Sequence, residues 1–349
     1  MAKINLLTIH YGKCYGAVMQ TYATCKLLEE QGHIVRVINI INPSQKRGNY
    51  HLSYWKDSIR EFQFWLFKKR YFSQMTNKGY SICEIKLPES DVTVVGSDQV
   101  WNKDITGCFN GTFFLDFVAE NENKVALSSS FGKELWCETD DYTNDVKKYL
   151  ASFSAISVRE YSGVQILKTK FDIEAINLLD PTLAYGKFCN LVLNKKRRKQ
   201  IFLFLLKRSE DALKRASFIS KDINVPLFSH TRFTSRFMNG PRHWLTRIFN
   251  SDYIITDSFH GLALSIIFQK QFFVFCADEK KFTRLYSLLK LLGLENRYIP
   301  SIEYYQKNRD ILLEPIDYAK VNQILAMERN KYNAFIKESI TECHDTAKK

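Results

Sequence analysis

Short apolar runs alternate along most of the chain with longer stretches in which apolar residues recur at helical spacing. Runs of this kind, with few charges, are typical of strands buried on both faces of a parallel sheet. The alternation predicts repeated β–α units in an α/β fold. The predicted strands are residues 4–9, 34–40, 91–95, 124–130, 155–158, 176–179, 201–206, 226–229, 253–255 and 271–276. The predicted helices are residues 17–31, 209–223, 242–250, 262–268, 278–292 and 317–341.

The clearest unit is residues 251–275, where a buried strand, a polar turn, an apolar helix and a second strand follow one another. Open α/β sheets bind ligands at the carboxyl ends of their strands, which is where this turn lies. Asp257 and Ser258 suit the helix N-cap, and Gly261 lets the backbone come close to a ligand. His260 falls in the first turn, where free N–H groups favour an anion. It is either a binding or proton-transferring group or a helix-start residue with a satisfied ring.

Two other strand exits carry polar residues. The loop at 10–16 contains glycine but lacks the GxGxxG spacing, so a binding role and a plain turn both stay open. The loop at 96–102 suits hydrogen bonding and ring stacking with a sugar, or a capped turn. Its polar residues and its aromatic ring are Ser97, Asp98, Gln99, Asn102 and Trp101.

Arg159 follows the predicted strand at 155–158. A guanidinium in that place suits two-pronged binding of a carboxylate or phosphate. The alternative is a surface ion pair with Glu160 or Asp172.

Residues 42–81 differ in composition, because aromatic residues alternate there with Lys and Arg. The pattern predicts a basic, aromatic-rich amphipathic helix. We favour packing of its apolar face on a neighbouring domain over contact with an anionic membrane surface. The run of five basic residues at 195–199 is typical of a solvated linker and places a domain boundary between residues 180 and 199.

Composition narrows the class of protein. With 349 residues, 45% hydrophobic and 25% charged, the chain suits a soluble protein of two domains. No run of eighteen apolar residues occurs, and the eight Cys form no CxxC pair, which favours reduced thiols in the cytoplasm over a zinc site. The net charge of +13 suits a polyanionic partner, but no nucleic-acid-binding motif is present.

Several of these segments together resemble the polysaccharide pyruvyl transferase family. They are YGAVMQTYA at 15–23, VVGSDQVWN at 94–102, SVRE at 157–160, LDPT at 179–182, TDSFHG at 256–261, KFTR at 281–284 and LLGL at 291–294. The resemblance implies an α/β fold of two Rossmann-like domains facing a cleft, similar to GT-B glycosyltransferases. It implies an N-terminal domain at 1–185 with a helical insertion at 43–80, a C-terminal domain at 199–316, and a helix at 317–349 that packs back on the first domain.

The family transfers a pyruvyl group from phosphoenolpyruvate to two hydroxyls of a sugar, releasing phosphate. The resemblance implies His260 as acid/base catalyst and Arg159 as a catalytic group that holds the donor. The implied donor-binding set is Arg159, Ser258, His260, Gly261, Lys280, Lys281 and Arg284. The implied acceptor-binding set is Tyr15, Gly16, Gln20, Ser97, Asp98, Gln99, Trp101 and Asn102. No metal or cofactor is required, and the acceptor is a sugar or a lipid-linked oligosaccharide.

Two other interpretations stay open. A GT-B glycosyltransferase that uses a nucleotide sugar would share the fold. A non-enzymatic protein that binds nucleic acid, another anion or a membrane would account for the charge of +13. A peripheral contact with the anionic inner membrane face is compatible with the enzymatic interpretation.

Overall fold

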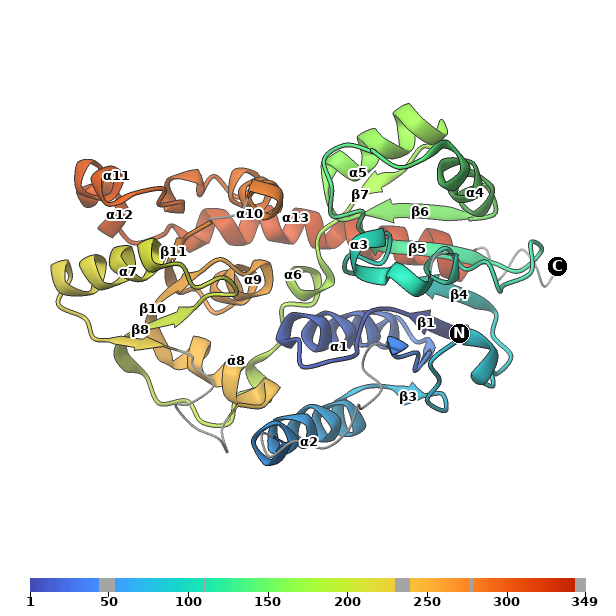
Figure 1. The fold of residues 1–349 in the computed structure, drawn as a ribbon, viewed down its shortest axis with the longest axis horizontal. Coiled ribbons are helices and arrows are strands. Elements are labelled where there is room, and N and C mark those ends of the chain that lie inside the picture. Colours follow the sequence, from blue (N-terminus) through green and yellow to red (C-terminus); the bar gives the residue numbers. More distant parts are fainter. Residues whose placement is uncertain (44–53, 110, 230–238, 277–278, 343–349) are drawn as a thin grey trace. The chain divides into compact units, whose positions relative to one another are not determined.

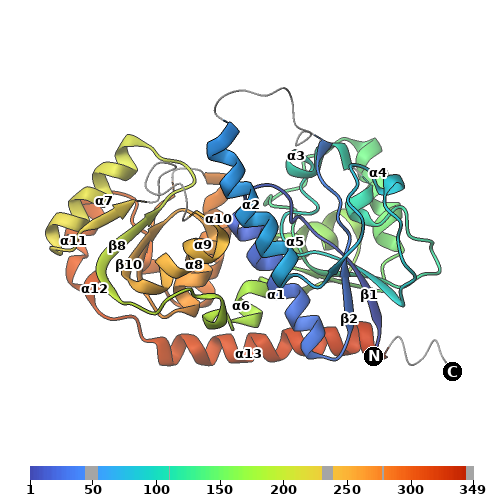
Figure 2. The same ribbon diagram turned by 90° about the horizontal axis from the view of Figure 1, so that it is seen from below.

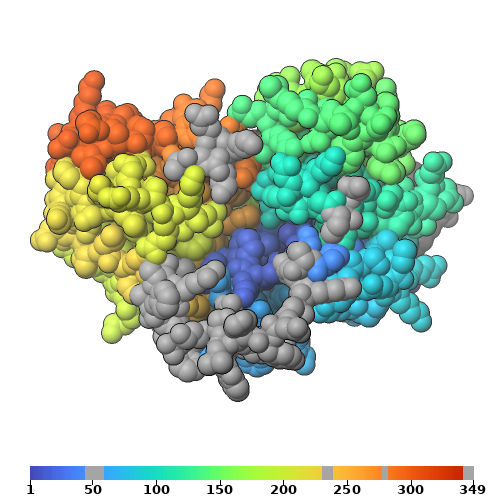
Figure 3. Space-filling view, viewed as in Figure 1, coloured from blue at the N-terminus to red at the C-terminus, as the bar shows by residue number. Residues whose placement is uncertain are grey.

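The computed structural model describes residues 1–43, 54–109, 111–229, 239–276 and 279–342, and of residues 54–58, 108, 279–281 and 341–342 it describes the backbone alone. The chain divides into two compact units, each built on a parallel sheet (Figure 1). Unit 1 comprises Met1–His51, Lys68–Tyr185 and Met327–Lys349. Unit 2 comprises Leu52–Phe67 and Gly186–Ala326. In the space-filling view (Figure 3), the surface of unit 1 is mainly blue to green and that of unit 2 mainly yellow to orange.

The sheet of unit 1 has the order β3-β2-β1-β4-β5-β6-β7, and all its pairings are parallel. Because β2 and β3 lie on one side of β1 while the later strands lie on the other, the strand order reverses between β1 and β4. That is the switch point at which doubly wound folds bind ligands. The strands are β1 (Lys3–Leu7), β2 (Ile34–Val37), β3 (Gln74–Met75), β4 (Val92–Val95), β5 (Lys124–Ser129), β6 (Ala155–Val158) and β7 (Ile176–Asn177).

Helix α1 is more deeply buried than its sequence pattern predicts. Every residue from Tyr15 to Cys25 is buried, whereas an amphipathic helix would expose one face. The short helix α6 packs on it, and the rings of Tyr22 and Tyr185 meet edge to face at 5.6 Å. The helices within unit 1 are α1 (Tyr15–Glu30), α3 (Lys103–Thr106), α4 (Asp140–Ala151), α5 (Tyr161–Ile166) and α6 (Pro181–Tyr185).

Unit 2 repeats the doubly wound plan on a smaller sheet of order β11-β10-β8-β9, again parallel throughout. Its core consists of apolar side chains from these strands and from the helices packed on them. The strands are β8 (Arg198–Phe204), β9 (Leu227–Ser229), β10 (Ser251–Thr256) and β11 (Gln271–Val274). The helices are α7 (Glu210–Asp222), α8 (Pro241–Asn250), α9 (Phe259–Ile267), α10 (Glu279–Leu291), α11 (Ile302–Lys307) and α12 (Arg309–Leu313).

Two long helices, α2 (Tyr54–Tyr71) and α13 (Tyr318–Ile336), contribute residues to both units. Each is one continuous helix (Figure 2). The expectation that residues 43–80 form an insertion in the first domain differs from this division, because Leu52–Phe67 clusters with unit 2. The reason is local packing: a Cβ built on Gly240, at the N-cap of α8, would lie 2.9 Å from Cβ of Gln63 in α2.

The second half of α13 packs within unit 1. Arg329 Nε donates to the carbonyl oxygen of Leu183 at 2.9 Å, and Tyr332 is fully buried. The boundary between the units along the chain falls after Tyr185, which is ahead of the basic run at 195–199 and within the range 180–199. No helix in the described part of the chain is both long and apolar enough to cross a membrane.

Candidate functional site

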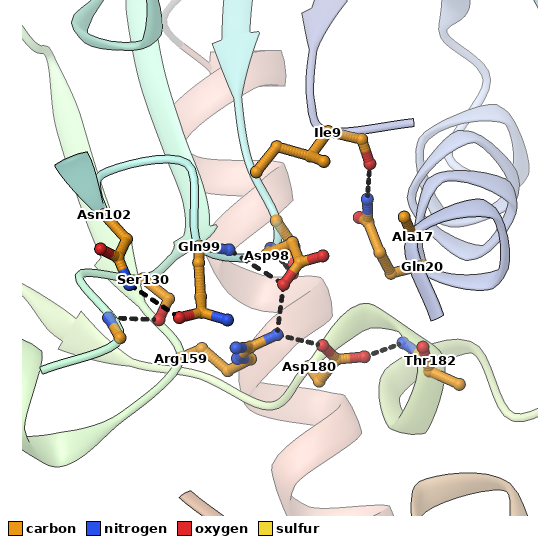
Figure 4. Close-up of polar contacts among 12 residues, drawn as sticks. Ile9, Ala17, Gln20, Asp98, Gln99, Asn102, Ser130, Arg159, Asp180 and Thr182 are labelled. Carbon is orange, nitrogen blue, oxygen red and sulfur yellow. Dashed lines mark hydrogen bonds and ion pairs between the residues drawn. The ribbon is translucent and has the colours of Figure 1, made fainter. Parts of the chain in front are cut away.

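In unit 1, the loops after β1 and β4 are held together at the switch point. Thr8 Oγ1 donates to the carbonyl oxygen of Ser97 at 3.1 Å. Gln20 of α1 donates through Nε2 to Thr8 Oγ1 at 2.9 Å and to the carbonyl oxygen of Ile9 at 3.0 Å. The Gln20 Oε1 atom has no hydrogen-bond partner among the described residues, and Figure 4 shows the side chain on the side of α1 that faces Asp98.

The loop after β4 is organised by its own side chains. Asp98 has a φ of 72°, and its Oδ1 accepts a hydrogen bond from the backbone N–H of Gln99 at 2.9 Å. Gln99 Oε1 accepts from Asn102 Nδ2 at 2.9 Å, and Asn102 Oδ1 caps α3 by accepting from Asp104 N at 3.1 Å. A Cβ on Gly132 would collide with Gln99 Oε1, so glycine there leaves room for the amide.

Arg159, directly after β6, lies among three carboxylates (Figure 4). Its Nε is 2.8 Å from Glu160 Oε1, and its Nη1 is 2.9 Å from Asp180 Oδ2 and 3.6 Å from Asp98 Oδ1. Asp180 Oδ1 in turn accepts from the N–H of Thr182 at 2.8 Å, which fixes the start of α6. Burial lowers the pKa of Arg159, but the carboxylates of Glu160, Asp180 and Asp98 together raise that pKa above its ordinary value.

The side chains of this charged cluster differ in how much of each is exposed to solvent. Only 2% of the Arg159 side chain and none of that of Asp180 is exposed, while Asp98 is exposed by 15%. The guanidinium of Arg159 is covered and already has three carboxylate partners, and direct binding of a donor by Arg159 stays a prediction. Asp98 is the member of the cluster that reaches the surface.

Trp101, which was predicted to stack on a sugar, lies inside the core. Its ring is buried, it stacks on Phe114 at 5.5 Å, and it lies 5.1 Å from Phe131. Its Nε1 donates to the carbonyl oxygen of Phe113 at 2.9 Å. The indole thus packs against other rings inside the core, and its only polar group is hydrogen-bonded there.

The remaining acceptor-binding candidates fall into two groups. Buried positions are held by Tyr15, Gly16, Gln20, Ser97 and Asn102. Asp98 and Gln99 are partly exposed. Asp180 and Glu160 were not among the candidates from sequence, although Asp180 follows a strand end just as Arg159 does. Neighbouring parallel strands end at one edge, so this shared position is a usable signal.

A second buried group near the end of β1 was also missed. His10 Nδ1 lies 3.0 Å from the carbonyl oxygen of Thr8, and Nε2 lies 3.2 Å from Asn39 Oδ1. Burial, and then the charge of Lys68, lower the pKa of His10 to about 4. The ring is therefore neutral at pH 7 and ties two strand exits together.

In unit 2, the turn after β10 is fixed by side-chain oxygens that accept hydrogen bonds from backbone N–H groups. Asp257 Oδ1 accepts from Leu206 N at 2.6 Å and Oδ2 accepts from Lys207 N at 2.9 Å, which joins the exits of β8 and β10. Asp257 is therefore not a helix cap. Ser258 alone is the N-cap of α9, and its Oγ accepts from Gly261 N at 3.3 Å.

Gly261 has a packing role that the sequence did not predict. A Cβ at this position would lie 2.6 Å from Thr256 Oγ1, so glycine is needed for α9 to pack against the end of β10. Next to it, His260 is buried in the first turn of α9, with its ring edge-on to that of Phe259 at 5.5 Å. The helix start therefore presents a histidine and backbone N–H groups at the carboxyl edge of the sheet, where an anion is favoured.

The predicted cations of the donor set lie on α10. The side chains of Lys280 and Lys281 are outside the described residues, while that of Arg284 is partly buried. Within the described residues no group of three His, Cys, Asp or Glu side chains is arranged to hold a metal ion.

Comparison with known proteins adds a family and a fold. The model of the family described as polysaccharide pyruvyl transferase matches residues 15–275. No curated protein matches the chain. UDP-GlcNAc 2-epimerase from Neisseria meningitidis bound to UDP-GlcNAc is similar in structure, with a TM-score of 0.53, 8% identity and coverage of 98% of this chain and 100% of that one. The S. aureus MnaA–UDP co-structure has a TM-score of 0.51, 11% identity and coverage of 98% and 97%. At these identities the likeness concerns the fold, and it confirms the predicted α/β, GT-B-like class.

Proposed function

Because the chain belongs to the polysaccharide pyruvyl transferase family, we propose that it transfers a pyruvyl group from phosphoenolpyruvate to two hydroxyls of one sugar in a surface-polysaccharide precursor. The product is a cyclic ketal, and inorganic phosphate is released. The observation that carries the proposal is the family match over residues 15–275, which includes the polar carboxyl edges of both sheets.

The start of α9 suits the donor. Phosphoenolpyruvate carries a carboxylate and a phosphate, and a helix N-terminus offers both free N–H groups and a favourable dipole to such anions. Ser258 and His260 are the polar side chains of that turn, and the N–H of Gly261 donates to Ser258 Oγ until a ligand competes for it. Lys280, Lys281 and Arg284 follow on α10, and we assign to them the neutralisation of the phosphate that leaves.

His260 is our candidate for the proton transfer to carbon. In the first step its proton goes to the methylene carbon of phosphoenolpyruvate, which becomes a methyl group, while an acceptor hydroxyl oxygen bonds to the central carbon. Phosphate then leaves with the electrons of its C–O bond, and the second hydroxyl oxygen takes its place. Two hydroxyl protons are released in total: one balances the proton placed on carbon, and the other leaves with phosphate or solvent.

Asp98 is our candidate for removing the proton of the attacking hydroxyl. Its Oδ1 is held by Gln99 N and faces Arg159, and Asp98 is the exposed carboxylate of that cluster. Arg159 then acts through Asp98, as a positioning residue that holds this carboxylate in place from 3.6 Å.

The proposal is tested by the choice of donor. Purified protein is titrated with phosphoenolpyruvate and, separately, with UDP and UDP-GlcNAc, and thermal unfolding is followed. We expect phosphoenolpyruvate alone to raise the Tm, and phosphate release to begin when a panel of sugar acceptors is added. Stabilisation by the nucleotide compounds with no effect of phosphoenolpyruvate would overturn the proposal in favour of glycosyl transfer.

A further inference from the structure

Helix α2 has apolar side chains on two opposite sides. On one side Phe64 and Phe67 are only 2% and 3% exposed, and the guanidinium of Arg60 lies 5.7 Å from the Phe64 ring. Residues four and three apart share one side of a helix, so these three form the packed side. An ordinary amphipathic helix has one buried apolar side of this kind, so its pattern accounts for Phe64 and Phe67.

The other side of α2 is apolar and exposed. Phe62, Trp65 and Leu66 are 57%, 49% and 45% exposed, and Lys69 completes their spacing of three, four and seven residues. At about 100° per residue, this set points away from Phe64 and Phe67. Among side chains that the structure describes, Phe62 and Trp65 are the only exposed Phe and Trp, although the chain has 26 Phe and 5 Trp.

The exposed residues form a patch and are not scattered. The rings of Phe62 and Trp65 stack at 5.6 Å with an angle of 27° between their planes, and Leu66 is adjacent in sequence. Single exposed apolar residues are normal, whereas a contiguous apolar patch marks an interaction site.

Positive charge lies at one end of this patch. The last turn of α2 carries Lys68, Lys69 and Arg70, and both Lys69 and Arg70 are exposed. Over its whole length α2 has five basic and two acidic residues, and the chain has a net charge of +13. An aromatic patch beside Lys and Arg complements the interface of an anionic bilayer, where rings sit at headgroup depth and cations meet lipid phosphates.

We propose that the face formed by Phe62, Trp65, Leu66 and Lys69 docks the protein on an anionic lipid surface. The two rings and Leu66 enter the boundary between headgroups and acyl chains, and Lys69 and Arg70 bind the anionic headgroups. The charge at the edge of the patch favours lipid over a second copy of this chain, because two copies meeting through this face would bring like charges together. The inference does not depend on pyruvyl transfer.

The test is sedimentation of the full-length protein with vesicles. Vesicles of phosphatidylcholine with phosphatidylglycerol are compared with pure phosphatidylcholine, at low and high salt. We expect binding that requires phosphatidylglycerol and weakens at high salt. The double variant Phe62→Ser/Trp65→Ser and the double variant Lys69→Glu/Arg70→Glu should each bind at least roughly tenfold more weakly.

Matched controls sit elsewhere on the surface. Leu135→Ser removes a side chain that is 72% exposed in unit 1, and Lys147→Glu reverses an exposed charge on α4. Both controls should bind like the wild type, and all variants should keep the wild-type unfolding temperature. The proposal would be overturned if Phe62→Ser/Trp65→Ser bound vesicles as tightly as the wild type does. It would also be overturned if the wild type bound neutral and anionic vesicles equally. A dimer that light scattering detects in the wild type and that this double variant loses would assign the patch to self-association and overturn it as well.

Discussion

The guanidinium of Arg159 holds the carboxylate of Asp180 at 2.9 Å, with at most 2% of either side chain exposed. The pair joins the loop after β6 to the start of α6. Removing one partner of such a pair leaves a buried charge without compensation, which is more costly than the pair itself is stabilising. The same guanidinium lies 3.6 Å from Asp98 Oδ1, and its proposed role is to support that carboxylate.

We expect Arg159→Lys to keep the protein folded and to lower kcat by roughly tenfold or more, with a much smaller change in the KM for phosphoenolpyruvate. Lysine keeps the charge but loses the planar fork that reaches Glu160, Asp180 and Asp98 together. Arg159→Ala should lower the free energy of unfolding by about 3–5 kcal/mol. A large rise in the donor KM with kcat unchanged would instead show direct contact with the donor.

Asp98 is the proposed base for the acceptor hydroxyl, and its role is tested by removing its charge. Asp98→Asn preserves shape and removes the base, so kcat should fall by roughly a hundredfold. Asp104→Asn is the matched control, because Asp104 is a nearby carboxylate that is 73% exposed. Equal activity of the two variants would remove Asp98 from proton transfer.

His260 is tested by a pair of substitutions. His260→Ala should lower turnover by roughly a hundredfold or more, the size of a general acid–base contribution. His260→Gln keeps a hydrogen-bonding side chain without the titrating ring, so it should bind phosphoenolpyruvate but remain slow. Donor affinity is measured separately from steady-state turnover. Near-normal turnover of His260→Gln would leave anion binding as the only role of the residue.

Trp101 is buried and Trp65 is half exposed, so truncating each of them tests the burial through protein stability. Trp101→Ala should lower the free energy of unfolding by about 3–5 kcal/mol, because the indole fills the core. Trp65→Ala should change it by no more than about 1 kcal/mol, since the ring is half exposed. Denaturant unfolding measures both, and similar losses for the two variants would contradict the observed burial.

The lowered pKa of His10 predicts that the free energy of unfolding depends on pH. Its pKa is lowered from 6.5 to about 4 in the folded state, so below pH 6.5 the unfolded state binds one more proton than the folded state. Stability from this group is complete above pH 6.5 and is lost as pH falls towards 4, by about 3 kcal/mol in total. His10→Gln should remove that slope from the unfolding free energy between pH 6.5 and 4. An unchanged slope in the variant would show that other groups cause it.

The strand–helix alternation predicted the architecture because parallel strands are buried on both faces and appear in sequence as apolar runs. The position of His260 followed for the same reason, since a polar turn after a buried strand begins the next helix. Of the partners of Arg159, Glu160 was named from the sequence as one of two alternatives, and the structure shows that pair in a buried setting. Asp98 and Asp180 did not follow, because they meet Arg159 only once β4 to β7 lie side by side.

The packing of other residues could not be predicted, because one residue type serves two environments. Trp101 stands among polar residues in sequence, yet its ring turns into the core. Gly261 suits ligand approach, but only the 2.6 Å distance to Thr256 Oγ1 shows that helix packing requires it. For α2 the sequence left packing and membrane contact as alternatives, and the structure shows one packed side and one exposed side.

The central claim is ketal formation from phosphoenolpyruvate. The most direct measurement uses donor labelled with ¹³C at its central carbon, incubated with the protein and a panel of sugar acceptors, and follows that carbon by NMR. The account predicts a new ketal carbon signal in one sugar product, formed in equal amount with inorganic phosphate. Phosphate release that yields only free pyruvate, or a labelled donor that stays intact while a nucleotide sugar is consumed, would contradict it.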